Sequence, residues 1–165
     1  MATSIAIVSD THLPKGRREL PEECVRISRE SDLIVHAGDF MKIEVLEMFE
    51  SLGPPLLAVS GNVDSAELQG RLPETVTVEV ESARLSVIHD SGPRKGRLNR
   101  MRRRFPDSDA VIFGHSHLPL HEEEDGFQIF NPGSPTERRR SPFKSMGKAT
   151  VEGGRISFKL VDLGI

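Results

Sequence analysis

In the first half of the chain, short apolar runs alternate with segments of helical periodicity. The apolar runs cover residues 4–8, 33–37 and 56–59, and each has the length of a buried strand. Between them, residues 20–30 carry apolar side chains on one helical face. Apolar residues also recur at helical spacing over residues 43–49, where Gly53-Pro54-Pro55 follows and ends the helix. This alternation predicts parallel strands joined by crossover helices.

The second half of the chain is richer in strand patterns. The further elements expected there are strands at residues 75–80, 84–88 and 110–113, and a polar helix at residues 95–104. Two hairpins are expected near the end of the chain, one around residues 124–126 and one at Gly153-Gly154, between strands at residues 149–152 and 155–160. The 165 residues contain no internal repeat or linker, so we expect a single domain over residues 1–165. Its predicted class is α/β, with a mixed sheet or two packed sheets.

Composition and charge exclude several classes of protein. The net charge of −3 gives no general attraction to nucleic acid or to an anionic membrane. The chain has no Trp or Tyr, and most of its Phe residues lie in apolar runs, so sequence-specific nucleic-acid binding is not expected. No stretch is apolar and long enough to cross a membrane. Cys24 is the only cysteine, and residues 1–10 lack the features of a signal peptide, so we expect the cytoplasm.

Polar residues with metal-ligand chemistry follow the predicted strands, at the points where the apolar runs end. Five runs end in this way, and the residues that follow them are Asp10 and His12, Asp39, Asn62, His89, and His115 and His117. In open α/β sheets, binding sites gather at the carboxyl ends of strands. Five strand ends that meet at one crevice would supply a metal centre.

The number and type of these residues predict two metal ions. Seven ligands are too many for one tetrahedral ion, but they suit two ions that share a bridging carboxylate. Imidazole, carboxylate and amide-oxygen ligands together favour Mn, Fe, Co, Ni or Zn. A lone Asp-x-His is more often a turn or a cap, so the prediction depends on the ordered set. The glycines that precede Asp39, Asn62 and His115 would let the backbone approach the metals closely.

With these clusters identified, the sequence resembles the calcineurin-like metallophosphoesterases. The blocks of that family, in order, match SDTH (9–12), GD (38–39), GN (61–62), His89 and GHSH (114–117). The short length and the sequence Asn131-Pro132-Gly133-Ser134 resemble the small YfcE-like phosphodiesterase branch, in which this loop borders the site. The resemblance implies two packed β-sheets with helices outside.

The resemblance also implies a role for each ligand. Asp10, His12 and His117 would hold one metal ion, Asn62, His89 and His115 the other, and Asp39 would bridge them. Such a pair of ions clamps a phosphate, and a bridging hydroxide attacks phosphorus in line with the leaving group. The expected function is therefore hydrolysis of a P–O bond in a small phosphodiester or nucleotide-like substrate. Two divalent ions are expected, Mn first, with Ni, Fe, Zn, Co or Mg as alternatives.

One position departs from the wider superfamily. Many members have a histidine after the Gly-Asn pair, which is thought to protonate the leaving group, whereas this chain has Val63 followed by Asp64. Without that acid, poor leaving groups should react slowly, which favours activated esters and diesters. The candidate catalytic residues are Asp39, Asn62 and Asp64. Asp64 could position the site, assist proton transfer or serve only a turn.

Several alternatives stay open at the level of sequence. A retromer subunit resembles this branch and serves mainly in protein binding, so the rival function is a non-catalytic scaffold. His36 is either a hydrogen-bond partner that orients a ligand or a histidine of the core. The basic stretches at residues 94–104 and 138–140 either attract phosphate or are solvated. The family often forms homo-oligomers, which makes one possible here.

Overall fold

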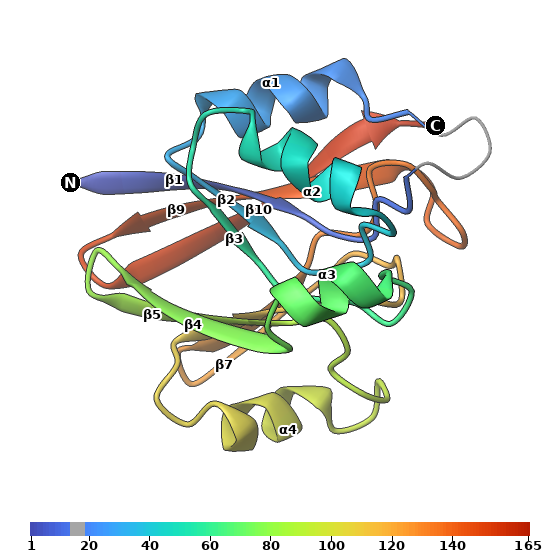
Figure 1. The fold of residues 1–165 in the computed structure, drawn as a ribbon. Coiled ribbons are helices and arrows are strands. Elements are labelled where there is room, and N and C mark those ends of the chain that lie inside the picture. The colour runs from blue at the N-terminus through green and yellow to red at the C-terminus, as the bar shows by residue number, and fades with distance from the viewer. Residues whose placement is uncertain (14–18) are drawn as a thin grey trace.

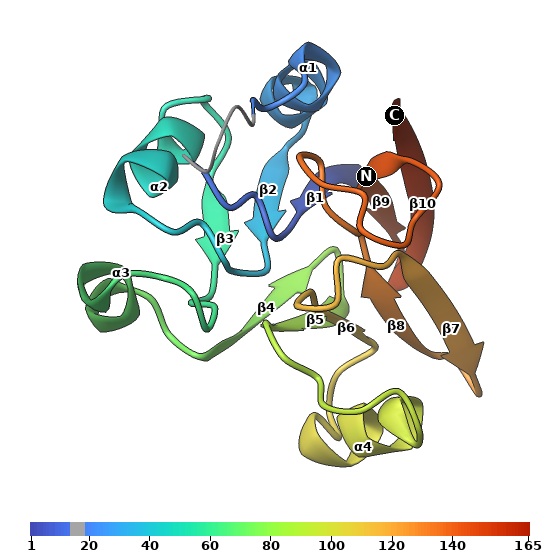
Figure 2. The same ribbon diagram turned by 90° about the vertical axis from the view of Figure 1, so that its right-hand side faces the viewer.

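The computed structural model describes residues 1–13 and 19–165, and these residues form four layers (Figure 1). Two five-stranded sheets pack face to face, with helices on the outer face of each sheet (Figures 1 and 2). The expected α/β sandwich of two mixed sheets is therefore confirmed. Within the described residues, no helix combines the length and the apolar character that crossing a membrane requires.

The first sheet has the strand order β10-β9-β1-β2-β3. Its strands are β1 (Ala2–Val8), β2 (Leu33–His36), β3 (Leu56–Ala58), β9 (Lys144–Glu152) and β10 (Arg155–Gly164). Strands β1, β2 and β3 are parallel, and β9 pairs antiparallel with both β1 and β10. The predicted parallel core and the hairpin at Gly153-Gly154 are both present. Strand β9 begins at Lys144, whereas the sequence predicted a start at residue 149. The prediction missed this part because Ser145-Met146-Gly147-Lys148 interrupts the alternation of apolar and polar residues.

The second sheet has the order β4-β5-β6-β8-β7. Its strands are β4 (Thr75–Val80), β5 (Ala83–Ile88), β6 (Ala110–Ile112), β7 (Leu120–Glu124) and β8 (Phe127–Asn131). Strands β5, β6 and β8 are parallel, whereas β4 and β7 form antiparallel edges. The exposed, acidic β7 is a typical edge strand, since charge discourages pairing with other chains.

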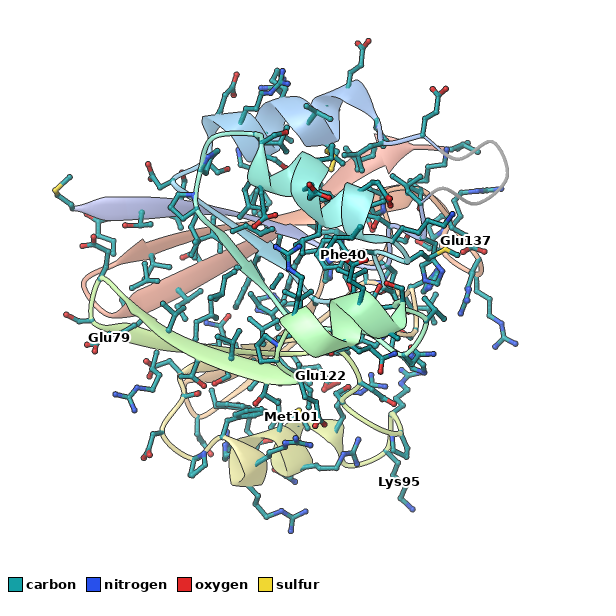
Figure 3. The ribbon with its side chains drawn as sticks, viewed as in Figure 1. Phe40, Glu79, Lys95, Met101, Glu122 and Glu137 are labelled. Atoms are coloured by element: carbon teal, nitrogen blue, oxygen red, sulfur yellow. The ribbon has the colours of Figure 1, made fainter. Side chains whose placement is uncertain are left out.

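The helices differ in how they cover the sheets. Helices α1 (Glu22–Glu30) and α2 (Ile43–Glu50) cover the first sheet, and α4 (Arg97–Arg104) covers the second (Figure 1). Met101 is the buried residue of α4 and faces the sheet (Figure 3). The short α3 (Ala66–Arg71), which the sequence did not predict, lies beside β3 and β4 (Figure 2).

Three apolar clusters fill the spaces between these layers. The central cluster lies between the two sheets and includes Ile7, Val35 and Val87. A second lies under α1 and α2, and a third lies under α4. Because apolar contacts fix both sheets from both sides, the loops at their carboxyl ends are held in a defined relation to each other.

Candidate metal centre

The seven residues predicted as ligands all lie in loops that leave the carboxyl ends of strands. Figure 2 looks onto the side of the molecule where these loops gather. The loops after β1, β2 and β3 come from the first sheet, and those after β5 and β6 come from the second. The packing of the two sheets therefore brings together side chains that are more than one hundred residues apart in sequence.

One group of candidate ligands consists of Asp10, His12 and His117. One ligand atom from each lies within 4.8 Å of the others, and all three residues are buried. Asp10 Oδ1 is 3.4 Å from His117 Nε2 and 3.7 Å from His12 Nε2. The two imidazole Nε2 atoms are 3.2 Å apart. Three donor atoms thus converge on one point.

A second group consists of Asp39, His89 and His115, whose ligand atoms also lie within 4.8 Å of one another. Asn62 joins this group, because its Oδ1 is 3.0 Å from His89 Nε2 and 3.1 Å from His115 Nδ1. Asn62 and His115 are exposed, whereas the first group is buried. Solvent therefore reaches the centre from the side of the second group.

Asp39 lies between the two groups. Its Oδ2 is 3.3 Å from His12 Nε2, in the first group, and 3.1 Å from His89 Nε2, in the second. Its Oδ1 accepts a hydrogen bond from the Val63 amide at 3.0 Å. This carboxylate has the position that a bridging ligand requires.

Electrostatics at the centre favour positive charge. Burial opposes ionisation of Asp10, but the facing imidazoles of His117 and His12 keep its pKa well below the usual range. The pKa of Asp39 is lowered against burial in the same way, by His12 and His89. Burial disfavours the charged form of His12, yet Asp10 and Asp39 raise its pKa to about 9. Two ionised carboxylates therefore share a small volume with imidazole nitrogens.

A buried acceptor without a partner tests whether these residues fit a metal. Asp10 Oδ1 is buried and accepts no hydrogen bond, whereas Asp10 Oδ2 accepts from the Ser9 hydroxyl and the His115 amide. An unsatisfied buried carboxylate oxygen is costly. A divalent cation would satisfy this oxygen together with the facing nitrogens, and carboxylate with imidazole is a donor set that such cations accept. The residues fit the metal that the sequence predicted.

The backbone at the centre is strained. Asp10, His12, Asp39, His115 and His117 all have positive φ angles, between 45° and 74°. Residues other than glycine rarely adopt this conformation, and such strain concentrates at functional sites. The surrounding structure therefore maintains a backbone conformation that these residues would not adopt in an unconstrained loop, and this conformation sets the positions of the candidate ligand side chains.

Two of the glycines in the predicted motifs are required by close approach of ligand side chains. A Cβ atom at Gly61 would collide with the Asp39 carboxylate, and one at Gly114 would collide with Ser9 Oγ and the Asp10 carboxylate. These two glycines are therefore needed because ligand side chains approach the backbone here.

Hydrogen bonds fix the orientation of the histidines. His89 Nδ1 is 2.7 Å from the Ala37 carbonyl, so Nδ1 carries the proton and donates, which leaves Nε2 free to bind a cation. The Glu137 carboxylate lies 3.2 Å from His117 Nδ1, in ion-pair range but not aligned for a hydrogen bond. Glu137 lies on the same side of the molecule as the other site loops (Figure 3).

Asp64 and His36 both support the loop that carries Asp39. The buried Asp64 carboxylate accepts hydrogen bonds from the amides of Gly61 at 2.7 Å, Met41 at 2.7 Å and Asp39 at 3.2 Å. His36 Nδ1 accepts from the Gly38 amide at 3.1 Å, and burial lowers the pKa of His36 to about 3. His36 is thus a neutral histidine of the core, and its hydrogen bond also orders the loop that carries Asp39. The two roles that the sequence left open for His36 therefore occur together.

The sequence did not identify several residues that hold the loops. Ser134 Oγ donates to the Asp10 carbonyl, and Thr136 Oγ1 donates to the Thr11 carbonyl, both at 2.8 Å. Asn131 donates to the Gly114 carbonyl at 3.1 Å. The loop after β8 therefore borders the site, as the resemblance implied. Hydroxyl residues are common in loops, so only the resemblance around residues 131–134 indicated this role.

Comparison with known families decides the classification of the chain. A sequence model of the calcineurin-like phosphoesterase superfamily domain matches residues 3–154. The chain belongs to this superfamily. The resemblance seen in the sequence motifs is thereby confirmed, and all five motif blocks lie inside the matched range.

A metallophosphoesterase and a phosphodiesterase are among the proteins to which this chain is similar in sequence. A probable metallophosphoesterase of Methanothermobacter thermautotrophicus is 31% identical over 162 residues, which cover 97% of this chain and 92% of the relative. A phosphodiesterase of Methanocaldococcus jannaschii is 28% identical over 142 residues, 78% of this chain and 82% of the relative.

A solved structure shares the calcineurin-like fold almost completely. Vacuolar protein sorting 29 from Cryptosporidium parvum superposes with a TM-score of 0.81 over 99% of both chains. Its sequence identity to this chain is 21%, so the likeness concerns the fold alone.

Proposed function

We propose that the protein is a dinuclear metal-dependent phosphodiesterase. The observation that supports this most directly is the unsatisfied, buried Asp10 Oδ1 among imidazole nitrogens. Asp39 adds to it, because one oxygen of its carboxylate faces both groups of candidate ligands. Membership of a family of phosphoesterases and the related archaeal phosphodiesterase agree with this function.

The proposed ligand roles follow the two groups. Asp10, His12 and His117 would hold one ion. Asn62, His89 and His115 would hold the other, and Asp39 would contact both. When bound, such a pair of ions supplies an activated water and stabilises the charge on the phosphoryl oxygens. Asn62 and His115 are the exposed members of the set, so the substrate phosphate enters on their side.

The substrate class is proposed from the residue after Asn62. Val63 is 41% exposed, and its side chain has no proton to donate to a leaving group. Asp64 makes its hydrogen bonds to backbone amides, although proton transfer by Asp64 stays an untested prediction. We therefore propose phosphodiesters and activated esters as substrates, and slow hydrolysis of alkyl phosphomonoesters.

A non-catalytic scaffold is the second candidate function, and the fold of vacuolar protein sorting 29 favours it. A scaffold has no need to keep metal ligands, whereas this chain has a suitable residue at each of the seven ligand positions. Catalysis is therefore the function we propose first.

Metal identity, location and assembly are proposed from the sequence. Mn is the metal we expect first, because the mixed donor set suits borderline divalent ions. We propose the cytoplasm as the location, since the single cysteine, Cys24, is buried and unpaired. A homo-oligomer remains a prediction that rests on the resemblance to the family.

The experiment that tests the function compares two aryl phosphates. The protein is stripped with a chelator and reloaded with Mn, Ni, Mg or Zn. Hydrolysis of bis(p-nitrophenyl) phosphate and of p-nitrophenyl phosphate is then followed. We expect metal-dependent hydrolysis in which the diester reacts faster than the monoester. Absence of turnover with every metal, from a folded protein, would exclude the enzymatic function.

Matched variants locate the activity. Asp39→Asn and His117→Ala should each lower kcat/KM by at least about a hundredfold, since each removes a metal ligand. The controls are Asp107→Asn and His121→Ala, which change exposed residues of the same types outside the centre. Full activity in both ligand variants would refute the proposed centre.

A further inference from the structure

A pocket of about 450 Å³ adjoins the loop that carries His115 and His117. Ser116 and Leu118, from this loop, form one part of its wall. Three arginines contribute to the rest, namely Arg94 and Arg97 near the start of α4, and Arg140 from the loop after β8. We call this the arginine pocket. None of the proposed ligand roles involves it.

The arginines of this pocket differ from other surface arginines in their ion pairing. Elsewhere on the surface, Arg26, Arg104 and Arg139 pair with glutamates at 3.0 to 3.7 Å. Among the residues that the structure describes, no carboxylate lies in ion-pair range of Arg94, Arg97 or Arg140. Glu122 and Asp90 act on Arg97 from beyond ion-pair range, so three guanidinium groups without a direct partner at one pocket still make it locally positive in a chain with a net charge of −3.

Arg97 is held in place before any ligand binds. Its Nη2 donates to the Gly92 carbonyl at 3.1 Å, and its guanidinium carbon lies 5.0 Å from the centroid of the Phe113 ring. Its Nε is buried and has no hydrogen-bond partner. Burial and the neighbouring Arg100 lower the pKa of Arg97. An anion bound in the pocket would offset the charge of this guanidinium group.

A second pocket beside the centre has acidic residues in its wall. This pocket, of about 380 Å³, is lined by Asn62 and His89 together with the acidic residues Glu74 and Asp90. A phosphodiester has two substituents, and both pockets adjoin residues of the centre. The two pockets therefore offer these substituents different charge.

We propose that the arginine pocket binds a second phosphate, carried on one substituent of the phosphodiester substrate. This inference rests on the proposed function and narrows its substrate class to diesters with one phosphorylated arm. Guanidinium groups match the geometry of phosphate oxygens. Leu118, which is 37% exposed, and Pro119 offer an apolar surface for the part of the substituent between the two phosphates. Hydrolysis consumes one water, breaks one P–O bond and yields an alcohol and a monoester, while the second phosphate is unchanged.

The test uses thymidine dinucleotides that differ only in a terminal phosphate. The reloaded enzyme is given TpT, pTpT and TpTp, and cleavage of the internal diester is followed by chromatography of the products. In the wild-type protein we expect kcat/KM for at least one phosphorylated dinucleotide to exceed that for TpT by about tenfold or more. In Arg97→Gln and Arg140→Gln, the ratio of kcat/KM for that phosphorylated dinucleotide to kcat/KM for TpT should fall towards one.

The control is Lys95→Gln. Lys95 lies on the same loop as Arg94, but its side chain points away from the molecule and does not line the pocket (Figure 3). This variant should keep the wild-type ratio. Arg140 is exposed and has no packing role comparable with the contact of Arg97 on Phe113, so Arg140→Gln remains informative if Arg97→Gln fails to fold.

The outcomes separate this inference from the proposed function. If bis(p-nitrophenyl) phosphate is hydrolysed but the three dinucleotides react equally, the arginine pocket does not select phosphate and this inference is wrong. The same conclusion follows if the arginine variants lower all dinucleotide rates equally. If no diester is hydrolysed, calorimetric titration with thymidine 3′,5′-bisphosphate decides. Binding that exceeds that of thymidine and is lost in Arg140→Gln supports the pocket, and absence of binding overturns it.

Discussion

At the scale of single residues, the centre depends on side chains that hold backbone amides. Asp64 shows this best, because its carboxylate accepts from three amides in two different loops. Burial raises the pKa of Asp64, so its charge depends on these hydrogen bonds for stabilisation. The same contacts fix the distance between the loops of Asp39 and Asn62.

Replacement of Asp64 by asparagine should weaken metal binding. One acceptor oxygen becomes an NH₂ donor that faces amide donors, which should lower the free energy of unfolding by about 1–3 kcal/mol. We expect a weaker metal affinity, measured by titration, and a pH profile of kcat with unchanged limbs. Loss of one limb of that profile with normal metal affinity would instead indicate proton transfer by Asp64.

Gly114→Ala should disturb the centre much more than its size suggests. The added Cβ would collide with Ser9 Oγ and with the Asp10 carboxylate, so Asp10 must move. We expect loss of metal from the purified protein, measured by elemental analysis. Gly70→Ala is the matched control, because no atom lies near its added Cβ and alanine favours the helix that contains it. Normal metal content in Gly114→Ala would show that the loop tolerates the shift.

At the scale of elements, the start of helix α3 is joined to the loop that carries Asp39. Helix α3 begins one residue after Ser65, whose hydroxyl accepts from the Leu68 amide at 3.3 Å. The Ser65 amide also donates to the Met41 carbonyl, which joins the start of α3 to the loop of Asp39. A six-residue helix with one buried side chain needs such a cap.

Ser65→Ala should therefore reduce stability. Loss of an N-cap costs about 1 kcal/mol, and we expect a decrease of that size in the free energy of denaturation by urea. Ser65→Asp retains a capping oxygen and should keep the wild-type value. Equal stability of Ser65→Ala and Ser65→Asp would show that the cap contributes nothing.

At the scale of the whole molecule, the centre forms where two sheets meet, so metal binding should stabilise the fold. Ligands come from loops of both sheets, and an ion bound by them favours the folded state alone. The negative charge that Asp10 and Asp39 concentrate in the centre would be neutralised at the same time.

Metal removal is the corresponding prediction. At a free metal concentration of a hundred times Kd, one site adds about 2.7 kcal/mol. For a chain of this length, that amount raises Tm by roughly 5–10 °C. Thermal denaturation with chelator and with Mn should show this difference, and Asp39→Asn should reduce it. An identical Tm with and without metal, in protein shown to be loaded, would contradict the prediction.

The sequence by itself determined the class of fold and the candidate ligands. Apolar runs and helical spacing indicated β1 to β6 and α1, α2 and α4, because strands and helices bury their faces at different periods. The motif blocks identified the seven ligand candidates, because each follows the end of an apolar run. The family followed from their order along the chain.

Only the tertiary structure decided the rest. The short α3 and the first half of β9 have weak local patterns, and contacts with Met41 and pairing with β10 hold them in place. The roles of Ser134 and Thr136 were hidden for the same reason, since a hydroxyl acquires a partner only when distant loops meet. The arginine pocket joins residues 94–97 to residues 116–120 and 140. A sequence read locally reveals which groups exist, whereas packing decides which of them share a site.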